Sequence, residues 1–501
     1  MVVYQVLEIA GSIWTWLMDH LLYINLFFSI VIVFFQRKDP KAVWTWLMAL
    51  YFVPVFGFLF YLVLEQDIHK SKMFRVKEVE DRFYYPAKKQ EELFKHYDFT
   101  LSNPMAESYG DMVMYNLEAG GAVLTMRNEI ELFNDGKEKF SDLIRTMKKA
   151  RSHIHIQYYI IKNDHLFDEI IEVLKVKVKE GVEVRILYDG MGGRFMPGKK
   201  WEELEAAGVK VGVFFPAILG RLNLRINYRN HRKIVVIDGK IGYVGGFNIG
   251  KEYLGEDPKF GYWRDTHLKI YGDAVISLQI RFALDWNYAT KENLFKKAEY
   301  FEPVIPLEDD GTFPMEFDKG LGIQIITSGP DQSTRQIRNN YLELFHKAKH
   351  HIYIQTPYFV PDDAILSALK IAAHSGVDVK LMIPCKPDHP FVYWATYSYI
   401  GDLLESGVNC YTYEDGFLHA KGVTIDGEVS CYGTANMDIR SFELNFEVNA
   451  VVYDRKTTEK LEWDFLEDLH QCKKITPAVY ASRSLIIRIK EQFSRLLSPL
   501  L

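Results

Sequence analysis

One pattern of polar and glycine residues occurs twice in this chain, and the duplication restricts the fold more than any other feature. The first copy holds His231, Lys233, Asp238, Gly245, Gly246 and Asn248, and the second holds His419, Lys421, Asp426, Gly433, Thr434 and Asn436. In both copies Lys follows His by two residues, Asp by seven and Asn by seventeen. An isolated His-x-Lys arises by chance, whereas two copies that agree at this many positions predict one site assembled from two half-sites.

The segments around the two copies repeat as well, in the same order. The elements expected in the first half and then in the second are helices at 139–150 and 337–349, strands at 154–161 and 351–355, helices at 166–179 and 363–374, and strands at 181–188 and 376–383. Units of strand, helix and strand build a mostly parallel sheet with helices on both faces. The sequence therefore predicts an α/β protein with two pseudo-symmetric lobes, at 131–305 and 306–501.

Each His-x-Lys motif starts a run that reads as a strand and ends at an Asp-Gly turn. Because side chains alternate along a strand, the His and the Lys of one motif should lie on the same face. The Asn comes from the next short strand, after a glycine that permits close backbone approach. We expect His, Lys and Asn to converge from neighbouring strands, and we expect Asp238 and Asp426 to stabilise the turns.

The side chains in this pattern suit a phosphate group better than a metal ion. Two histidines and two lysines would repel a cation, whereas a bound anion relieves the repulsion and is stabilised by Lys and Asn. Across a phosphodiester, one histidine can attack phosphorus and the other can protonate the leaving alcohol. A nucleophilic histidine needs a carboxylate to orient it. Asp265 follows the first copy and Glu447 follows the second, so we expect each to orient the histidine of its own half.

The first 65 residues are expected to form a hairpin of two transmembrane helices. Residues 43–64 are 22 residues without a charge, which is long enough to cross a bilayer. The preceding uncharged run is shorter, so we expect its helix to start near Ser12 and to carry Asp19 and His20 near one end. A signal peptide or a buried core helix is the alternative, but no Lys or Arg precedes Arg37, as a signal peptide would require.

The remaining parts of the chain give weaker indications. Five Lys or Arg residues follow the second apolar run and three lie in the turn between the runs, which favours a cytoplasmic catalytic part. Residues 66–130 have no recognisable motif and are expected to be a membrane-proximal linker. Residues 482–497 predict a basic amphipathic helix, which would either lie on an anionic membrane or pack on its own domain.

Composition limits the class of ligand and of site. The chain has 60 basic and 66 acidic residues and a net charge of −6, so nucleic acid is not an expected partner. The four cysteines form no Cys-x-x-Cys pair, and neither a zinc site nor a disulfide framework is predicted.

The repeated pattern H-x-K-x4-D-x6-G-[GST]-x-N resembles the motif of the phospholipase D superfamily. Together with the two apolar runs, the segment 434–447 and the closing Ser-Pro-Leu-Leu, the chain resembles the bacterial cardiolipin synthases over essentially its whole length. Gly246 departs from the pattern, because many superfamily members carry Ser there. The resemblance implies a multi-pass protein of the cell membrane that transfers a phosphatidyl group from one phosphatidylglycerol to another, without a metal or other cofactor, giving cardiolipin and glycerol.

The resemblance also implies roles for individual residues. The catalytic set is His231, Lys233, Asp238, Asn248, His419, Lys421, Asp426 and Asn436. Asp265 and Glu447 would orient the histidines, and the expected phosphate-binding residues are Gly246, Thr434, Arg264 and Arg440. For both arginines, a salt bridge to a neighbouring carboxylate is an equal alternative. His231 is expected to be the nucleophile and His419 the acid and base.

Several functions stay open on the sequence alone. Within the superfamily, the chain could hydrolyse phospholipids or transfer the phosphatidyl group to another alcohol. A nuclease is disfavoured by the apolar runs and the acidic balance. An inactive lipid-binding scaffold is disfavoured because both motifs are intact. Oligomeric state has no signature in the sequence.

Overall fold

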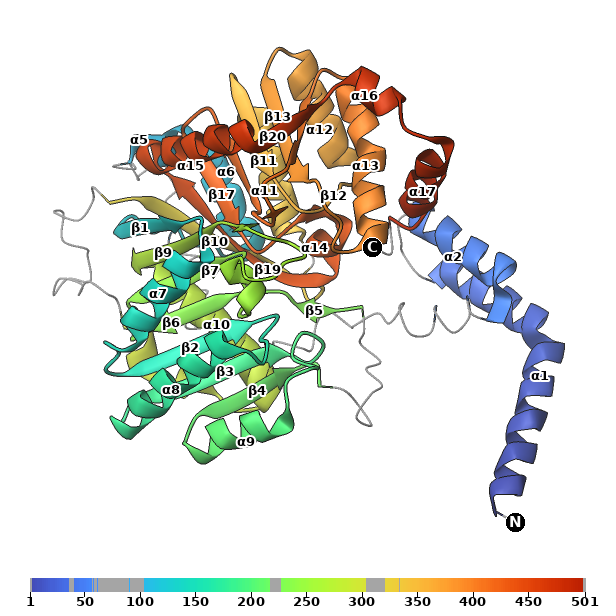
Figure 1. Ribbon diagram of the computed structural model, residues 1–501, viewed down its shortest axis with the longest axis horizontal. Coiled ribbons are helices and arrows are strands. Elements are labelled where there is room, and N and C mark those ends of the chain that lie inside the picture. The colour runs from blue at the N-terminus through green and yellow to red at the C-terminus, as the bar shows by residue number, and fades with distance from the viewer. Residues whose placement is uncertain are drawn as a thin grey trace.

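Two α/β lobes, each built around one sheet, make up most of the chain (Figure 1). The computed structural model describes residues 2–35, 40–55, 57, 61, 90, 103–216, 227–302, 320–332 and 334–498. Each helix and strand expected from the internal repeat is present in the described residues. The prediction of a duplicated α/β fold is therefore confirmed.

The first lobe has a seven-stranded sheet with helices on both faces. Its strands, in spatial order, are β1 (Asn128–Phe133), β9 (His267–Gly272), β7 (Ile241–Gly245), β6 (Ile234–Ile237), β2 (His153–Tyr158), β3 (Glu183–Asp189) and β4 (Lys210–Phe214). Helices α7 (Gly136–Met147), α8 (His165–Lys179) and α9 (Gly198–Ala206) pack on one face, and α10 (Ala274–Thr290) packs on the other. The amphipathic pattern of α7 and α8 places their apolar residues against β2 and β3.

The second lobe repeats this plan. Its strands, in spatial order, are β10 (Gly322–Ser328), β19 (Asn445–Tyr453), β17 (Val429–Gly433), β16 (Gly422–Ile425), β11 (His351–Gln355), β13 (Asp378–Pro384), β14 (Asn409–Tyr413) and β20 (Cys472–Ile475). Helices α11 (Gln336–Lys347), α12 (Asp363–His374) and α13 (Pro390–Leu404) cover one face, and α15 (Arg455–Asp468) covers the other.

Both sheets are mixed, so the prediction of mostly parallel sheets is wrong. Among the long strands of the described residues, the parallel runs are β2–β3–β4 and β11–β13–β14. The repeated motif itself forms the hairpins β6–β7 and β16–β17, and the following strands β9 and β19 also run antiparallel. The Asp-Gly turn inside each motif reverses the chain after four residues of strand, which leaves no room for a crossover helix.

The lobes meet through one hydrophobic core and two short strand pairs. Apolar residues of β6, β7 and β9 pack against those of β10, β17 and β19. In addition, β5 (Arg229–Asn230) pairs in parallel with β19, and β15 (Phe417–Leu418) pairs in parallel with β8 (Trp263–Arg264). Each short strand pair joins one lobe to the other directly next to a motif histidine.

Residues 103–127 belong to the second lobe, although the sequence suggested a linker over 66–130. Helices α5 (Pro104–Ser108) and α6 (Gly110–Gly120) bury Ala106, Met112 and Val113 in the same core as α11. The carboxamide of Asn103 caps α5 by accepting from two backbone N–H groups. Residues 128–130 of the proposed linker belong to β1, and residues 66–102, apart from Gln90, lie outside the described residues.

At the amino terminus, α1 (Val2–Ile30) continues through a π-helical turn, η1 (Val31–Phe35), and packs beside α2 (Pro40–Phe52). The Asn25 amide donates to the Leu50 carbonyl at 2.7 Å. The helix begins at Val2 and not near Ser12, so Asp19 and His20 lie within it and not near its start. No helix in the described residues combines the length and apolarity of a membrane span. The predicted span at 43–64 lies partly outside those residues.

The described residues hold nine further elements. They are η2 (Lys251–Leu254), η3 (Leu294–Lys296), η4 (Ala298–Phe301), β12 (Phe359–Val360), β18 (Met437–Asp438), α14 (Ile439–Glu443), η6 (Leu469–Gln471), α16 (Pro477–Ala481) and α17 (Leu485–Leu496).

Candidate active site

The two motif histidines lie at the boundary between the lobes, and backbone pairing fixes their positions. His231 follows β5, and its backbone N–H donates to the carbonyl of Phe446 at 3.0 Å. His419 follows β15, and its backbone N–H donates to the carbonyl of Arg264 at 2.7 Å. Each histidine is thereby placed beside the next residue of the other lobe's strand, which is Glu447 for His231 and Asp265 for His419.

The orienting carboxylates are therefore exchanged between the lobes, and the prediction that each serves its own half is wrong. The Nδ1 atom of His231 lies 3.0 Å from both carboxylate oxygens of Glu447. The Nδ1 atom of His419 lies 2.5 Å from Oδ2 of Asp265. With Nδ1–H donating to a carboxylate, Nε2 is the ring nitrogen left for chemistry. The imidazole side chains are 12% and 10% exposed, whereas both carboxylates are fully buried.

The motif lysines bind the backbone of the histidine two residues earlier. Lys233 Nζ donates to the carbonyl of His231 at 2.7 Å, and Lys421 Nζ donates to that of His419. Contrary to the sequence prediction, His and Lys precede strands β6 and β16 and are not part of them. Burial lowers the pKa of Lys233 to about 7 and that of Lys421 to about 8.

The charged groups of the two half-sites influence one another across the boundary between the lobes. Burial lowers the pKa of His231, and the charges of Lys233 and of Lys421 from the other lobe lower it further against the opposing effect of Glu447. Burial, Lys421 and Lys233 lower the pKa of His419 to about 4. An anion placed among these four groups would favour their charged forms.

The two motif asparagines differ in their contacts. Asn248 uses both ends of its carboxamide: Oδ1 accepts from the backbone of Ile160 at 3.1 Å, and Nδ2 donates to the hydroxyl of Tyr253 at 3.0 Å. The buried Oδ1 of Asn436 has no hydrogen-bond partner among the described residues. Of the two, Asn436 is the carboxamide with an atom available to a ligand.

Asp238 and Asp426 stabilise the fold and do not line the site. The Asp238 carboxylate accepts from the backbone N–H groups of residues 151, 152 and 153, and that of Asp426 accepts from those of 349, 350 and 351. Both residues have φ of 53° at the start of the motif turn, a conformation that Asp tolerates better than most residues. Their structural role agrees with the turn argument, and within the described residues the two carboxylates bond to turn backbone and not to the motif histidines.

Gly246 and Thr434 occupy equivalent positions, and both contact an orienting carboxylate. The Thr434 hydroxyl is fully buried and donates to Oε2 of Glu447 at 2.6 Å. A Cβ atom at Gly246 would lie 1.9 Å from Oδ1 of Asp265, so this position must be glycine for the carboxylate to keep its place. Thr434 and Gly246 were predicted to bind phosphate, and in this structure the Thr434 hydroxyl is engaged by Glu447.

The two predicted phosphate-binding arginines have protein partners. Arg264 donates through Nε to Asp468 at 2.9 and 3.1 Å and through Nη1 to the carbonyl of Asp265 at 2.6 Å. It is 3% exposed, so the salt-bridge alternative is correct for this residue. Arg440 donates to both the side chain and the carbonyl of Asn227, at 3.0 and 2.8 Å.

A buried polar layer behind the site was missed by the sequence analysis. Arg232 donates through Nη1 to both carboxylate oxygens of Asp285, each at 2.7 Å, and through Nε to the carbonyl of Glu447 at 3.1 Å. Arg264 makes the equivalent contacts in the other half, through Nε to both carboxylate oxygens of Asp468 and through Nη1 to the carbonyl of Asp265. The glutamines that marked the repeat bind these two aspartates, Gln157 in the first lobe and Gln355 in the second. The two glutamines recur at equivalent positions of the repeat, and this recurrence is the sequence signal that could have revealed the polar layer.

Aromatic side chains flank both histidines and were also missed. The ring of Tyr159 lies 5.0 Å from that of His231, edge to face, and Trp263 lies 5.1 Å from His419. Lys233 Nζ is 5.7 Å from the centre of the Tyr159 ring. These rings give the site an apolar wall and contribute to the burial that lowers the pKa of the cationic groups.

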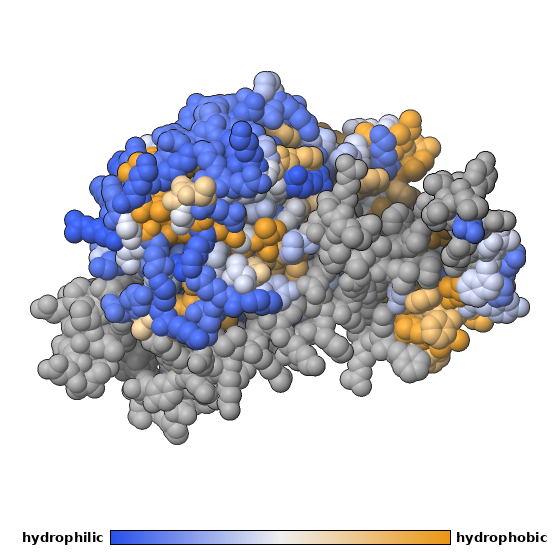
Figure 2. Space-filling model, turned by 90° about the horizontal axis from the view of Figure 1, so that it is seen from below, coloured by the Kyte–Doolittle hydropathy of each residue, from blue (hydrophilic) through white to orange (hydrophobic). Residues whose placement is uncertain are grey.

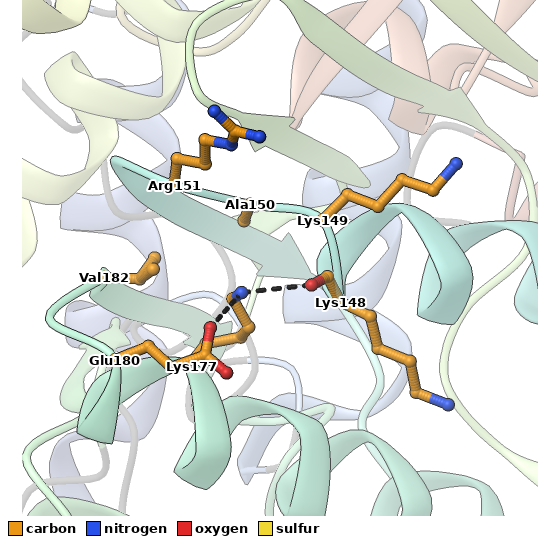
Figure 3. A pocket seen from close by; sticks show the side chains of 7 residues that line it. All are labelled: Lys148, Lys149, Ala150, Arg151, Lys177, Glu180 and Val182. Atoms are coloured by element: carbon orange, nitrogen blue, oxygen red, sulfur yellow. Dashed lines mark hydrogen bonds and ion pairs between the residues drawn. The ribbon is translucent and has the colours of Figure 1, made fainter.

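A separate hollow lies at the start of β2 and β3, beside the turn of Asp238 and away from the histidines (Figure 3). It encloses about 480 Å³ and is lined mainly by basic residues. In Figure 3, Lys177 points inward and binds Glu180 and the carbonyl of Lys148, whereas Lys149 points away. Its cations are thus partly engaged, and it shares no residue with the catalytic motifs.

The chain matches known proteins along nearly its whole length. A family model described as cardiolipin synthase, PLD-like domain, matches residues 143–260 and 341–469, and one described as phospholipase D-nuclease N-terminal matches 24–66. A cardiolipin synthase of Listeria innocua is 47% identical over 96% of this chain and 98% of its own length. Cardiolipin synthase 2 of Staphylococcus epidermidis is 47% identical over 95% of this chain and 96% of its own length.

One solved structure supports the fold. The phosphatidylserine synthase of Haemophilus influenzae Rd KW20 superimposes with a TM-score of 0.58, covering 78% of this chain and 100% of that chain. At 16% sequence identity this likeness concerns the duplicated fold alone.

Proposed function

The chain belongs to the family of cardiolipin synthases with phospholipase D-like domains, and from this membership we propose that it makes cardiolipin from two molecules of phosphatidylglycerol. The observation that supports this most is the pair of histidines, each oriented through Nδ1 by a carboxylate of the other lobe, with two lysines beside them. Such a site holds a phosphodiester between a nucleophile and an acid.

In the first step, Nε2 of His231 attacks the phosphorus of one phosphatidylglycerol. The bond between phosphorus and the glycerol headgroup oxygen breaks, and His419 gives that oxygen a proton, so that glycerol leaves. The phosphatidyl group is then bound to His231 through a phosphorus–nitrogen bond. Lys233 and Lys421 stabilise the charge that develops on the phosphoryl oxygens.

In the second step, the acceptor is the glycerol headgroup of another phosphatidylglycerol. His419, now neutral, removes the proton of a headgroup hydroxyl, and the oxygen attacks phosphorus. The phosphorus–nitrogen bond breaks, cardiolipin forms, and both histidines return to their starting protonation states. The overall change converts two phosphatidylglycerols into one cardiolipin and one glycerol.

We assign the nucleophile to His231 because its carboxylate is held firmly in place. Glu447 contacts Nδ1 with both oxygens and accepts from the hydroxyl of Thr434. Burial acts to raise the pKa of Glu447, but His231 and Lys233 overcome this effect and keep the pKa below its ordinary value. A charged, fixed carboxylate stabilises the cationic imidazole that forms during attack on phosphorus.

We further propose that the α1–α2 hairpin inserts into the cell membrane, with the lobes on the cytoplasmic side. The hairpin displays a belt of exposed large apolar side chains that includes Trp16, Leu22, Phe27, Phe34 and Phe52. Exposed apolar area of this size favours lipid over water. The excess of Lys and Arg after the second apolar run supports the cytoplasmic side.

Purified protein reconstituted with labelled phosphatidylglycerol, in the presence of EDTA, tests the reaction. We expect cardiolipin and free glycerol in equal amounts, and no product from the His231→Ala variant. Phosphatidic acid as the only product would replace the proposal with a hydrolase. Product only after addition of another alcohol would identify a different acceptor, and absence of turnover would contradict transferase activity with this donor.

A further inference from the structure

The carboxy-terminal helix α17 is packed with its polar side inward and its apolar side outward. Glu491 and Ser494 are each 1% exposed, whereas five large apolar side chains of this helix are each more than half exposed and Ile487 alone is half-buried. The exposed apolar residues are Leu485, Ile486, Ile489, Phe493 and Leu496. A helix in contact with water on its outer side buries the opposite face.

Specific contacts fix α17 in this orientation. Glu491 is paired with Arg483 at 2.7 Å, and Arg495 donates to Asp402 of α13 at 2.6 Å. The hydroxyl of Tyr399 on α13 donates to Ser498 at 3.2 Å, and the Ser484 side chain caps the first turn. The polar inner face is therefore satisfied by protein partners, and the apolar face is left for something outside the lobes.

The exposed cations of α17 indicate what lies there. Arg488 and Lys490 are exposed on the helix that carries the apolar face. An apolar face with adjoining cations matches an anionic lipid surface, because the apolar side chains enter the acyl region and the cations meet the phosphates. A protein partner could bind the apolar face without the adjoining cations, so the combination of the two favours an anionic bilayer.

The position of α17 agrees with this occupant. Figure 1 shows α17 at the same end of the molecule as α2, to the right in that view. In Figure 2, hydrophobic surface gathers at that end of the molecule, while much of the opposite end is hydrophilic. The helix α17 and the hairpin thus both expose apolar side chains at the same end of the molecule.

We propose that α17 docks in the surface of an anionic bilayer and holds the lobes against it, so that lipid headgroups reach the site. The proposal rests on the proposed function only in naming phosphatidylglycerol and cardiolipin as the anionic lipids. A chain of contacts joins the helix to the site: α17 packs on α13, α13 on β12, and β12 pairs with β18, which begins directly after Asn436. Docking would therefore fix the site at a set height above the membrane.

An environment-sensitive fluorophore placed on Ile489→Cys tests the docking directly. The full chain, with Cys385 and Cys472 changed to Ala, is reconstituted in nanodiscs that contain phosphatidylglycerol. The matched control is Val176→Cys on α8, which is about as exposed as Ile489, at 52% against 59%. We expect the label at 489 to shift to shorter wavelength and to lose emission to lipids that carry a quencher on the acyl chain, with no change at 176.

Each other result with the label counts against the proposal. Emission at 489 that matches position 176 means that the helix stays in water. A shift without quenching by lipid, which disappears as protein is diluted in excess lipid, means that a second copy covers the face. An equal response in nanodiscs of phosphatidylcholine alone means that the cations play no part in docking.

Activity provides an independent test. Ile489→Glu with Phe493→Glu should lower the rate on long-chain phosphatidylglycerol in a bilayer by about tenfold or more, as loss of two membrane-inserted side chains implies. The rate of this double variant on short-chain phosphatidylglycerol dissolved as monomers should not change. The control variant Val176→Glu should keep its rate on both substrates. Equal losses on both substrates overturn the docking proposal. Absence of turnover in the unmodified chain counts against the proposed function and leaves the fluorescence result to decide the docking.

Discussion

The imidazole of His231 is oriented by Glu447, which lies 216 residues further along the chain in the other lobe. His419 and Asp265 form the reciprocal pair. This exchange follows from the two short parallel strand pairs that cross the boundary, because each pair aligns a histidine of one lobe with a carboxylate of the other. The two halves of the site thus depend on each other for orientation as well as for reaction.

Removing either carboxylate charge should impair turnover more than binding. Glu447→Gln and Asp265→Asn should each lower kcat by about 10²–10⁴-fold with a small change in KM, since a triad that loses its carboxylate loses the correct tautomer. Steady-state kinetics on phosphatidylglycerol in mixed micelles provides the measurement. Imidazole NMR should show that Glu447→Gln perturbs His231 and leaves His419 largely unchanged. The opposite pattern would contradict the exchange between lobes.

The phosphorylated histidine can be identified by trapping. In His419→Ala both steps lose their proton-transfer group, so the donor must carry a leaving group that needs no proton, such as p-nitrophenol. With such a phosphatidyl donor the first step proceeds and the second lacks its base, so a phosphatidyl adduct should accumulate on His231 and be found by mass spectrometry of peptides from the acid-sensitive, base-stable fraction. His231→Ala should give no adduct. An adduct on His419 in His231→Ala, with none in His419→Ala, would reverse the two roles.

A single methyl group at Gly246 should disturb the second histidine. Because the added Cβ would meet Oδ1 of Asp265 at 1.9 Å, Gly246→Ala should displace this carboxylate from His419 and lower kcat by about tenfold to a hundredfold. Gly198→Ala is the matched control, since its Cβ would meet no atom within 4 Å. Full activity of Gly246→Ala would show that Asp265 can move without losing its contact.

The motif aspartates should matter for stability and little for chemistry. Asp238→Ala or Asp426→Ala leaves three backbone N–H groups without their acceptor, which should cost about 1–3 kcal/mol in the free energy of unfolding. The Asn variants should lose less, because Asn also adopts a positive φ. Denaturant unfolding followed by kcat measurement on the folded fraction checks both statements. A large loss of kcat with normal stability would place these residues back in the reaction.

Anion binding should take up protons and weaken as pH rises. Burial lowers the pKa of Lys233 to about 7 and that of Lys421 to about 8 in the empty site, so above pH 8 both are mostly neutral. A bound phosphate mimic such as tungstate favours the protonated lysines and raises their pKa. Affinity should therefore fall with increasing pH, approaching about tenfold per pH unit for each lysine that takes up a proton.

Calorimetry in buffers of different ionisation enthalpy measures this proton uptake. Lys233→Met and Lys421→Met should each reduce the number of protons taken up at pH 8.5, and an exposed lysine changed in the same way, such as Lys199, should not. Binding that is independent of pH between about pH 6 and pH 9 would contradict the lowered lysine pKa values.

The sequence was sufficient for features that depend on local patterning. Alternation and helical periodicity located the repeated helices and strands, and the doubled motif located both histidines and both lysines. The sheet direction was wrong because the motif hairpins, with the antiparallel strands that follow them, take the place of further crossover units in each sheet. The periodicity of a strand does not encode the direction of its partner.

The failures in the site have a different physical origin. Pairing of β5 with β19 and of β8 with β15 joins residues that are far apart in sequence, so proximity along the chain suggested the wrong carboxylate for each histidine. Arg264 likewise finds Asp468, which is 204 positions away. The engagement of Thr434 with Glu447 depends on the same long-range packing, which no local pattern contains.

The exchanged carboxylates also bear on how such a chain could have arisen. A primitive single-lobe protein would have carried a histidine and a carboxylate that could not meet within one molecule. It could complete its site only by associating with another copy, each lending its acid to the other. Gene duplication and fusion would then have turned a bimolecular assembly into a unimolecular one, after which the two copies were free to diverge, as Gly246 and Thr434 have done.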